Sequence, residues 1–469
     1  MKRIGMLSLL IFCLAMNVSA QSPWDLEQCI TYAKNHNISL KQTNLNNQIN
    51  LNNAEQSKAG VLPSLNAAAN HQYNFGQTID RYTNSFVKSQ AVLSQNFYLS
   101  SSVVLWSGMS QYNNIKANEY NYLSGVERLK QQENDLSLSV ANAYIGLIFS
   151  EEILKITQHQ YQITKEQLDR TQKLVAAGSQ AKSVEYDILA QLANEEVNVT
   201  TAENNYQLSL LTLKQLMNFD SVANFNIARP DINVQEGMLL ENNITGIYET
   251  ALKNQPSIKS SEYTILSAER YLRAGRGRIS PTLTFNASMG TGTSGLAKKV
   301  VGYQDQQQVL QTSVGNIFYN TQAPILVNTP FSEQFKNNAN KSIGFTFSMP
   351  LFNGLQTTTN VKNAKLNALN ARFGMDLAKQ NLYKSIAQAH ANAKAALNKF
   401  RSMEASVKAA NESFFYAQQK FNAGVISSFE YNSAKNRLFA AESNLMQAKY
   451  DYVFKLKVID YYLGKPLGL

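Results

Sequence analysis

The sequence predicts a mainly α-helical chain with a smaller membrane β part, built from two copies of one unit. Three observations lead to this fold class. Apolar residues recur every seven positions through two long stretches, two pairs of segments alternate apolar and polar residues, and both signals occur twice in the same order. Each unit is expected to hold two β-strands and a long coiled-coil helical hairpin, so the chain would supply four strands.

The second long helical hairpin is expected at residues 353–463. Apolar residues recur in sevens along its first arm and again along its returning arm, and a tight turn separates the two. A repeat of about 3.5 residues indicates helices that lie along one another with a left-handed supercoil. The repeating residues are Ile386, Ala393, Phe400, Val407, Phe414 and Phe421 on the first arm, and Tyr431, Leu438, Leu445, Tyr452 and Ile459 on the second.

The first long helical hairpin is expected at residues 107–217. Its apolar row aligns with that of the second hairpin at a shift of 246 positions, which is the difference between 354 and 108. Because the short motifs around both hairpins align at the same shift, the sequence indicates a structural duplication. The aligned row is Val140, Leu147, Leu154, Tyr161, Leu168 and Val175.

Glycine motifs mark both ends of the first arm in each hairpin. A strand-to-helix joint with the sequence Leu-Trp-Ser-Gly or Leu-Phe-Asn-Gly precedes the arm, and an Ala-Gly pair lies at the tip that ends it. Glycine is the residue that most readily adopts the left-handed conformation at a helix end. The joint glycines are Gly108 and Gly354, and the tip pairs are Ala177 with Gly178 and Ala423 with Gly424.

Residues 1–20 are predicted to be a secretory signal peptide. Two basic residues precede an apolar run at 4–16, and Val-Ser-Ala at 18–20 fits a cleavage site. The alternative, an N-terminal membrane anchor, is less favoured because the run is short for a membrane span. Cleavage leaves Cys29 as the single cysteine, so the mature chain cannot form an internal disulfide.

Shorter helices and irregular segments complete the two units. Pro63 and Pro281 are expected to end the shorter helices, because proline removes a helix donor and constrains the residue before it. The helices are expected at 21–62 and 244–280, an irregular equatorial segment at 218–243, and a C-terminal tail at 464–469.

Residues 63–106 and 281–352 are each predicted to be a strand pair. Their apolar residues alternate with small polar residues, which is typical of transmembrane barrel strands with lipid on one face and water on the other. The alternative is a soluble antiparallel sheet with one wet face. The apolar residues are Leu65, Ala67, Ala69, Tyr73 and Phe75, then Ala91, Leu93, Phe97, Leu99, Val103 and Leu105, then Leu283, Phe285, Ala287 and Met289, and finally Ile343, Phe345, Phe347, Met349 and Leu351.

Four strands cannot close a barrel, and open sheet edges are not tolerated in lipid. If the strands lie in a membrane, several protomers must therefore each contribute four. Residues 290–341 separate the two strands of the second pair and are rich in Gly, Thr, Gln and Asn. They are expected to form a long extracellular loop at the rim of the barrel.

The sequence gives little support to catalysis or to nucleic-acid binding. The four histidines lie far apart without metal-ligand spacing to Cys, Asp or Glu, and no nucleotide-binding loop or nucleophile motif occurs. The formal net charge is +10, and the +8 that remains after removal of Lys2 and Arg3 with the predicted signal peptide is dispersed along the predicted helices rather than clustered. The sequence therefore predicts no enzyme, no cofactor, no metal site and no nucleic-acid partner.

The hairpin tips carry the most informative side chains. Ser427 and Glu430 fit a capping box for the returning helix, and Ser183 is the cap candidate in the first copy. Acidic-aromatic pairs that begin at Glu185 and Glu430 follow the two tips. They fit compensation of the helix dipole, and they also fit a ring of carboxylates where protomers converge, so both interpretations stay open.

The signal peptide, the duplicated unit, the strand-to-helix joints and the Ala-Gly tips together resemble the TolC family of outer-membrane efflux channels. The resemblance covers residues from about 25 to 463. It implies a homotrimer in the outer membrane of a Gram-negative bacterium. Three copies of four strands would form a 12-stranded barrel in lipid, which continues into a periplasmic α-helical barrel. An inner-membrane transporter and a periplasmic adaptor would deliver substrates, which would then leave passively.

The resemblance also implies roles for the tips. The turns with Ala177, Gly178, Ala423 and Gly424 would meet the adaptor. Glu430 resembles an acidic residue of the constricted periplasmic entrance, with Glu185 as its approximate repeat partner. Ser433 stands where the family has a second acidic residue, which weakens the expectation of cation selectivity. The alternatives are a non-channel coiled-coil envelope protein, such as a periplasmic adaptor, and an enzyme.

Overall fold

The computed structural model describes residues 23–88, 90–219, 225–229 and 243–467. The predicted signal peptide at 1–20 and most of the predicted irregular segment at 218–243 lie outside the described residues. The described chain is mainly helical with a smaller strand-containing part, as the sequence predicts. It divides into a helical unit and a strand-containing unit, each assembled from segments that are distant in sequence.

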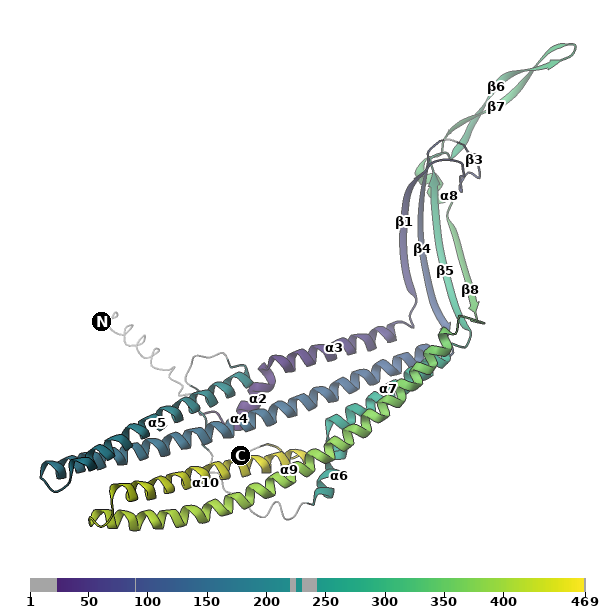
Figure 1. Ribbon diagram of the computed structural model, residues 1–469. Helices are drawn as coiled ribbons and strands as arrows, with labels where there is room; N and C mark the ends of the chain where they lie inside the picture. The colour runs from purple at the N-terminus through teal and green to yellow at the C-terminus, as the bar shows by residue number, and fades with distance from the viewer. Residues whose placement is uncertain (1–22, 89, 220–224, 230–242, 468–469) are drawn as a thin grey trace, which may run out of the picture. The chain divides into compact units, whose positions relative to one another are not determined.

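Two long helical hairpins account for most of the helical residues (Figure 1). α4 (Ser110–Ala176) and α9 (Gln356–Asn422) each contain 67 residues, or about 100 Å of helix at about 1.5 Å per residue. The returning helices α5 (Lys182–Met217) and α10 (Ser428–Tyr462) contain 36 and 35 residues. These matching lengths are those expected of a duplicated unit. None of the described helices has the length and apolar composition needed to cross a membrane.

Shorter helices pack against each hairpin within the helical unit. Cys29 shares a buried apolar cluster with Tyr144 of α4, and Ile247 shares another with Ile386 of α9. Burial raises the pKa of the Cys29 thiol to about 12, so this cysteine is a packing residue rather than a reactive one. The shorter helices are α2 (Leu26–His36) and α3 (Ile38–Ala59) in the first copy, and α6 (Ile244–Asn254) and α7 (Pro256–Gly277) in the second.

The strand-containing unit holds a four-stranded antiparallel sheet whose two faces differ in chemistry. Phe285 of its third strand lies opposite Val103 on one side and Phe345 on the other, so large apolar residues line one face. On the other face Asn286 lies opposite Ser102. The sheet order is β1 (Ser64–Asn74), β4 (Val92–Trp106), β5 (Thr282–Ser294) and β8 (Asn340–Ser348).

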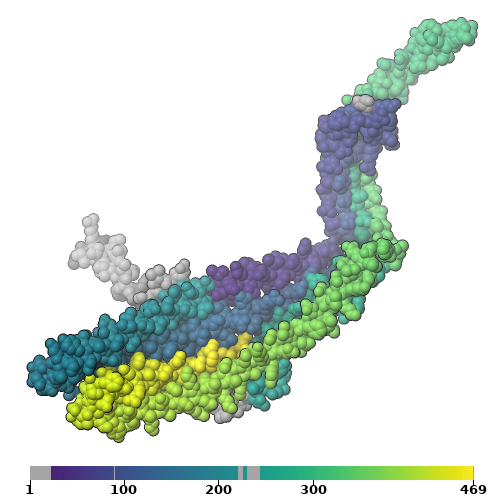
Figure 2. All heavy atoms as spheres, viewed as in Figure 1, coloured from purple at the N-terminus to yellow at the C-terminus, as the bar shows by residue number. Residues whose placement is uncertain are grey.

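The expected loop at 290–341 is largely ordered secondary structure, which corrects the prediction. It contains the hairpin of β6 (Lys298–Thr312) and β7 (Gly315–Asn328), followed by the short helix α8 (Phe331–Asn337). These strands could not be predicted from an apolar pattern, because the run 304–308 is Gln-Asp-Gln-Gln-Gln and has no apolar alternation. β6 and β7 pair with each other, and in the space-filling view the hairpin is a narrow arm (Figure 2).

Candidate functional site

The two hairpin tips adopt the same backbone turn. The N–H of Gly178 donates to the carbonyl of Val175 at 3.0 Å, and the N–H of Gly424 donates to that of Phe421 at the same distance. The φ angles of the two glycines are 74° and 72°, a left-handed conformation that favours glycine. In both turns the next residue donates back across five positions, which completes a Schellman motif.

The duplication extends to the far end of each returning helix. Asn218 after α5 and Gly464 after α10 have φ angles of 52° and 75°. Their N–H groups donate to Gln215 and Tyr461 at 3.0 Å in both copies. These positions again differ by 246 residues, so the C-terminal caps of both helices in each hairpin repeat. The sequence signal was present, but an Asn-for-Gly exchange concealed it.

Glu430 forms the predicted capping box with Ser427. The N–H of Ser427 donates to the Glu430 carboxylate at 3.1 Å, and the N–H of Glu430 donates to the Ser427 hydroxyl at 3.2 Å. The carboxylate also lies in the first turn of α10, where the helix dipole stabilises negative charge. Glu430 therefore has a structural role whether or not it also acts in conduction.

The first copy does not reproduce this cap, and the expectation for Ser183 is wrong. The N-cap of α5 is Ala181, which offers no side-chain acceptor, so Ser183 already lies inside the first helical turn. The two turns have the same length, because Ala181 and Ser427 each lie three residues after the tip glycine, so Glu185 lies one position further into its helix than Glu430 does. Glu185 instead accepts a hydrogen bond from the Gln172 side-chain amide of α4 at 3.2 Å. The two glutamates are thus each bonded within their own hairpin.

Several polar contacts join the two hairpins behind the tips. The Ser428 hydroxyl of α10 donates to the Asp187 carboxylate of α5 at 3.2 Å. Further contacts link Arg170 to Asn422 at 3.3 Å and the Gln191 amide to Asn436 at 3.5 Å. Beside them a groove of about 550 Å³ lies between α5 and α10. Its lining is Asp187, Gln191, Ser428, Phe429, Asn432, Ser433, Asn436, Arg437 and Ala440.

A buried ion pair is the least exposed of these links. The Lys435 ammonium of α10 lies 3.3 Å from the Glu195 carboxylate of α5, and the exposed fractions of the two side chains are 2% and 5%. The hydroxyl of Thr164, on α4, is within hydrogen-bond distance of both groups. Burial lowers the pKa of Lys435, and the attraction to Glu195 only partly offsets this effect.

Sequence reasoning missed this ion pair. The shift of 246 positions places Leu189 on Lys435 and Ala441 on Glu195, so neither charge recurs in the duplicated pattern. A comparison of the copies discards residues that differ between them. The usable signal was a lysine directly after Ala434, which belongs to the buried row of α10.

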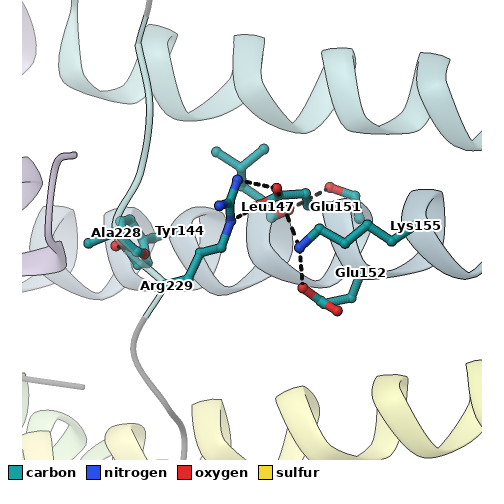
Figure 3. Close-up of polar contacts among 8 residues, drawn as sticks. Tyr144, Leu147, Glu151, Glu152, Lys155, Ala228 and Arg229 are labelled. Carbon is teal, nitrogen blue, oxygen red and sulfur yellow. Dashed lines mark hydrogen bonds and ion pairs between the residues drawn. The ribbon is translucent and has the colours of Figure 1, made fainter.

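A second polar cluster anchors an irregular segment to α4 (Figure 3). The Tyr144 hydroxyl donates to the carbonyl of Ala228 at 2.6 Å, and the Nε of Arg229 donates to Glu151 at 3.0 Å. Lys155 extends the cluster through an ion pair to Glu152 at 2.7 Å. Within the described residues 225–229, the segment is therefore fixed to the middle of a long helix.

The joint glycines also share one backbone geometry. Gly108 and Gly354 have φ angles of 59° and 61°, and the residues after them, Met109 and Leu355, are left-handed as well, at 62° and 65°. A Cβ on Gly108 would lie 2.3 Å from the carbonyl oxygen of Gly277, whereas one on Gly354 meets no described atom within 4 Å. The strand-to-helix joint is thus conformationally fixed in both copies and sterically fixed in the first.

No described group of His, Cys, Asp and Glu residues could hold a metal ion. The described histidines instead include residues with structural partners. His36 stacks on Tyr32 with ring centroids 3.9 Å apart, and His71 is hydrogen-bonded to Gln95 at 2.8 Å. The candidate site is a set of helix ends and interhelical contacts.

Comparisons with known proteins agree with this geometry. The family model described as outer membrane efflux protein matches residues 29–218 and 247–465. The chain is 22% identical over 450 residues to outer membrane protein TolC of Salmonella enteritidis, covering 94% of this chain and 82% of that protein.

Two solved structures have the same fold. The open state of the Neisseria gonorrhoeae MtrE outer membrane channel superposes with a TM-score of 0.72 at 18% identity, covering 95% of this chain and 90% of that one. The outer membrane protein VceC of Vibrio cholerae superposes with a TM-score of 0.72 at 15% identity, covering 94% and 96%.

Proposed function

The chain belongs to the outer membrane efflux protein family and serves as an outer-membrane efflux channel, and we propose that it does so as a homotrimer. Three copies of the four-stranded sheet would close a 12-stranded barrel in the lipid, and the six long helical hairpins would form a tunnel in the periplasm. Substrates would pass through passively, since the sequence has no nucleotide-binding motif that could supply energy.

The strongest support comes from the apolar face of the sheet. Ile343, Phe345 and Phe347 of β8 are 78%, 69% and 68% exposed, and Leu65 of β1 is 69% exposed. Side chains of this size clustered on one exposed face are unfavourable in water and favourable against lipid. The opposite face carries Asn, Ser, Thr and Gly, which suits a water-filled interior.

The open edges of the sheet support an assembly of several copies. β1 and β8 are the outer strands, and each pairs with one neighbour in the described chain. Unpaired backbone groups cost several kcal/mol each in a bilayer. Pairing β8 of one protomer with β1 of the next removes both edges at once, and it closes a ring when the copies are related by rotation.

We place the periplasmic entrance at the hairpin tips. The tip turns with Gly178 and Gly424 would meet the helical hairpins of a periplasmic adaptor, which couples the channel to an inner-membrane transporter. Exposed Val425 and Phe429 beside the second tip offer apolar contact area for that partner. Opening would move α9 and α10 relative to α4 and α5, as a shift of packed helices between two arrangements.

The carboxylates of Glu185 and Glu430 would lie near the entrance and favour cations. The contacts that join the hairpins, including Asp187 with Ser428 and Lys435 with Glu195, would limit how far the tips separate. A coiled-coil adaptor is the weaker alternative, because an exposed apolar sheet face is unfavourable in a water-soluble protein.

The assembly is tested by counting chains and mapping the sheet edges. Light scattering of the detergent-extracted protein should give three chains per particle. Cysteines introduced singly along β1 and β8 should cross-link between protomers only in β1–β8 combinations. A monomer that is stable without detergent would contradict the proposal.

A further inference from the structure

The connection between β1 and β4 is a compact turn rather than an open loop. Two short strands, β2 (Thr78–Ile79) and β3 (Phe86–Val87), pair at its base. Between them the N–H of Asp80 donates to the carbonyl of Ser85 at 2.9 Å, and the Asp80 carboxylate accepts the N–H of Tyr82 at 3.0 Å. We call residues 80–85 the inward turn. These hydrogen bonds give it a defined shape.

The inward turn is attached to the polar face of the sheet. Asn96 and Ser294 belong to that face, because they alternate along β4 and β5 with Phe97 and Thr293 of the opposite face. The Tyr82 hydroxyl donates to the Asn96 side chain, and the Ser294 hydroxyl donates to the Asp80 carboxylate. Asp80 and Ser294 are only 2% and 3% exposed.

A glycine makes room for this contact. Gly292 lies directly opposite Asn96 on the same polar face. A Cβ placed on Gly292 would lie 1.9 Å from the Tyr82 hydroxyl oxygen and 2.2 Å from the ring carbon that carries it. The tyrosine therefore occupies the space that any other residue at 292 would fill. Its position follows from packing as well as from hydrogen bonds.

The other face of the sheet is covered at the same level by α8. Phe97 contacts the rings of Phe331 and Phe335, with centroids 6.1 Å and 5.5 Å apart. The Gln334 side chain accepts the N–H of Ser294 at 2.9 Å and donates to its carbonyl at 3.1 Å. The end of β5 is thus contacted on both faces. These contacts fix the part of the sheet to which the inward turn is bonded.

We propose that the inward turn is the outer constriction of the conduit and sets the size of solutes that leave it. The inference rests on the proposed barrel, in which the polar face lines the water-filled interior. Each protomer would then project one inward turn from the wall into the mouth. At that level the pore would be lined by residues of the turn, centred on Tyr82, rather than by the strands themselves.

The constriction can be tested independently of the periplasmic entrance by labelling from outside the cell. Ser288→Cys places a thiol on the polar face of β5, about 20 Å from Ser294 at about 3.3 Å per strand residue. Cys29 is buried and does not compete for reagent. Intact cells are treated with a small maleimide and with a polymer-linked maleimide, and the ratio of the two labelling rates is measured.

With the native turn, the small reagent should label Ser288→Cys at least tenfold faster than the polymer. Tyr82→Ala combined with Asp80→Ala should release the turn and reduce this ratio at least threefold. Asn96→Ala removes the acceptor of the Tyr82 hydroxyl without altering the turn, so it should shift the ratio in the same direction. Tyr73→Ala, a tyrosine on the apolar face of the same sheet, should leave the ratio unchanged.

Two results would overturn the inference, and they are distinguishable. Equal ratios in all variants, with efficient labelling by the small reagent, would show that the conduit exists but that the turn does not narrow it. Labelling of Ala287→Cys on the apolar face in place of Ser288→Cys would show that the polar face is not a water-filled interior. That outcome would contradict the proposed barrel itself.

Discussion

Lys435 and Glu195 form a buried ion pair of 3.3 Å that joins the two helical hairpins of one chain. The pair is asymmetric, because the duplicated pattern carries no second copy of it. In the proposed opening one hairpin moves against the other, so a contact between the two hairpins would resist that movement. This ion pair is the most buried contact of that kind among the described residues.

Removing one partner of the pair should cost more than removing both. Glu195→Leu leaves the Lys435 ammonium buried without its counter-charge, which should lower the free energy of unfolding by about 3–5 kcal/mol. Glu195→Leu with Lys435→Met should restore most of the loss, because two apolar side chains need no compensation. The midpoint of denaturant unfolding, followed by helical circular dichroism, measures both effects.

Asp169→Ala supplies the matched control. This substitution breaks an exposed ion pair with Lys173, which lies on the same helix, α4. Exposed ion pairs contribute about 0–1 kcal/mol to the free energy of unfolding. A single mutant at Glu195 that behaves like Asp169→Ala would show that the buried pair does not hold the hairpins together.

The same pair predicts a pH dependence of stability. Burial puts the pKa of Lys435 in the folded chain below the ordinary value of 10.5. Between these two pH values the unfolded chain therefore binds more protons than the folded chain. The contribution of Lys435 to stability should therefore rise as the pH rises through the lowered pKa toward 10.5, and then level off. The difference in unfolding free energy between the native chain and Lys435→Met isolates this effect from other titrating groups. A pH-independent difference would contradict it.

Substitutions at Glu430 separate the two roles that the sequence leaves open. Glu430→Gln keeps an oxygen that can accept the Ser427 N–H but removes the charge, whereas Glu430→Ala removes both. Block of single-channel current by multivalent cations on the periplasmic side should disappear in both variants if the carboxylate acts at the entrance. If only Glu430→Ala changes the channel, the residue serves as a helix cap, with loss of the cap costing about 0.5–2 kcal/mol.

Glu185→Ala combined with Glu430→Ala should raise the open probability without dissociating the proposed trimer. Glu185 holds Gln172 across its own hairpin, so its loss loosens the first tip as the loss of the cap loosens the second. Open probability in planar bilayers reports the effect, and electrophoresis of the unheated protein reports whether the proposed trimer assembles. An unchanged open probability in the double variant would remove both residues from the gate.

The two joint glycines, Gly108 and Gly354, should differ in how well they tolerate substitution by alanine, although their φ angles are nearly equal. Alanine at either position pays for the left-handed backbone, about 1–2 kcal/mol. Gly108→Ala must also displace the carbonyl of Gly277, whereas Gly354→Ala meets no described atom within 4 Å. The yield of heat-resistant oligomer should therefore fall much more for Gly108→Ala. Equal yields would show that the first joint relaxes readily.

The helical hairpins could be predicted because their signal is local and repeated. The heptad row from Ile386 to Phe421 and its copy from Val140 to Val175 specify long paired helices without any knowledge of distant contacts. The capping box of Ser427 and Glu430 is equally local, since its two residues are three positions apart. These features need only the chemistry of one helix and its neighbour.

Other features depend on tertiary contacts that no local pattern contains. Lys435 and Glu195 are 240 positions apart, and neither takes part in the apolar repeat. The β6–β7 hairpin lies where a loop was predicted. Its strands are paired through backbone hydrogen bonds, and their Gln-rich run has no apolar alternation from which the strands could be predicted. The packing of Tyr82 against Gly292 could not be predicted from the sequence, because it depends on the register of β4 with β5.

The central claim, that this chain forms a conduit through the outer membrane, is tested most directly in a planar lipid bilayer. Purified, detergent-extracted protein should insert and give discrete, uniform conductance steps, and multivalent cations added on the periplasmic side should reduce them. A protein that stays in aqueous solution without detergent and gives no conductance would contradict the barrel and the channel together.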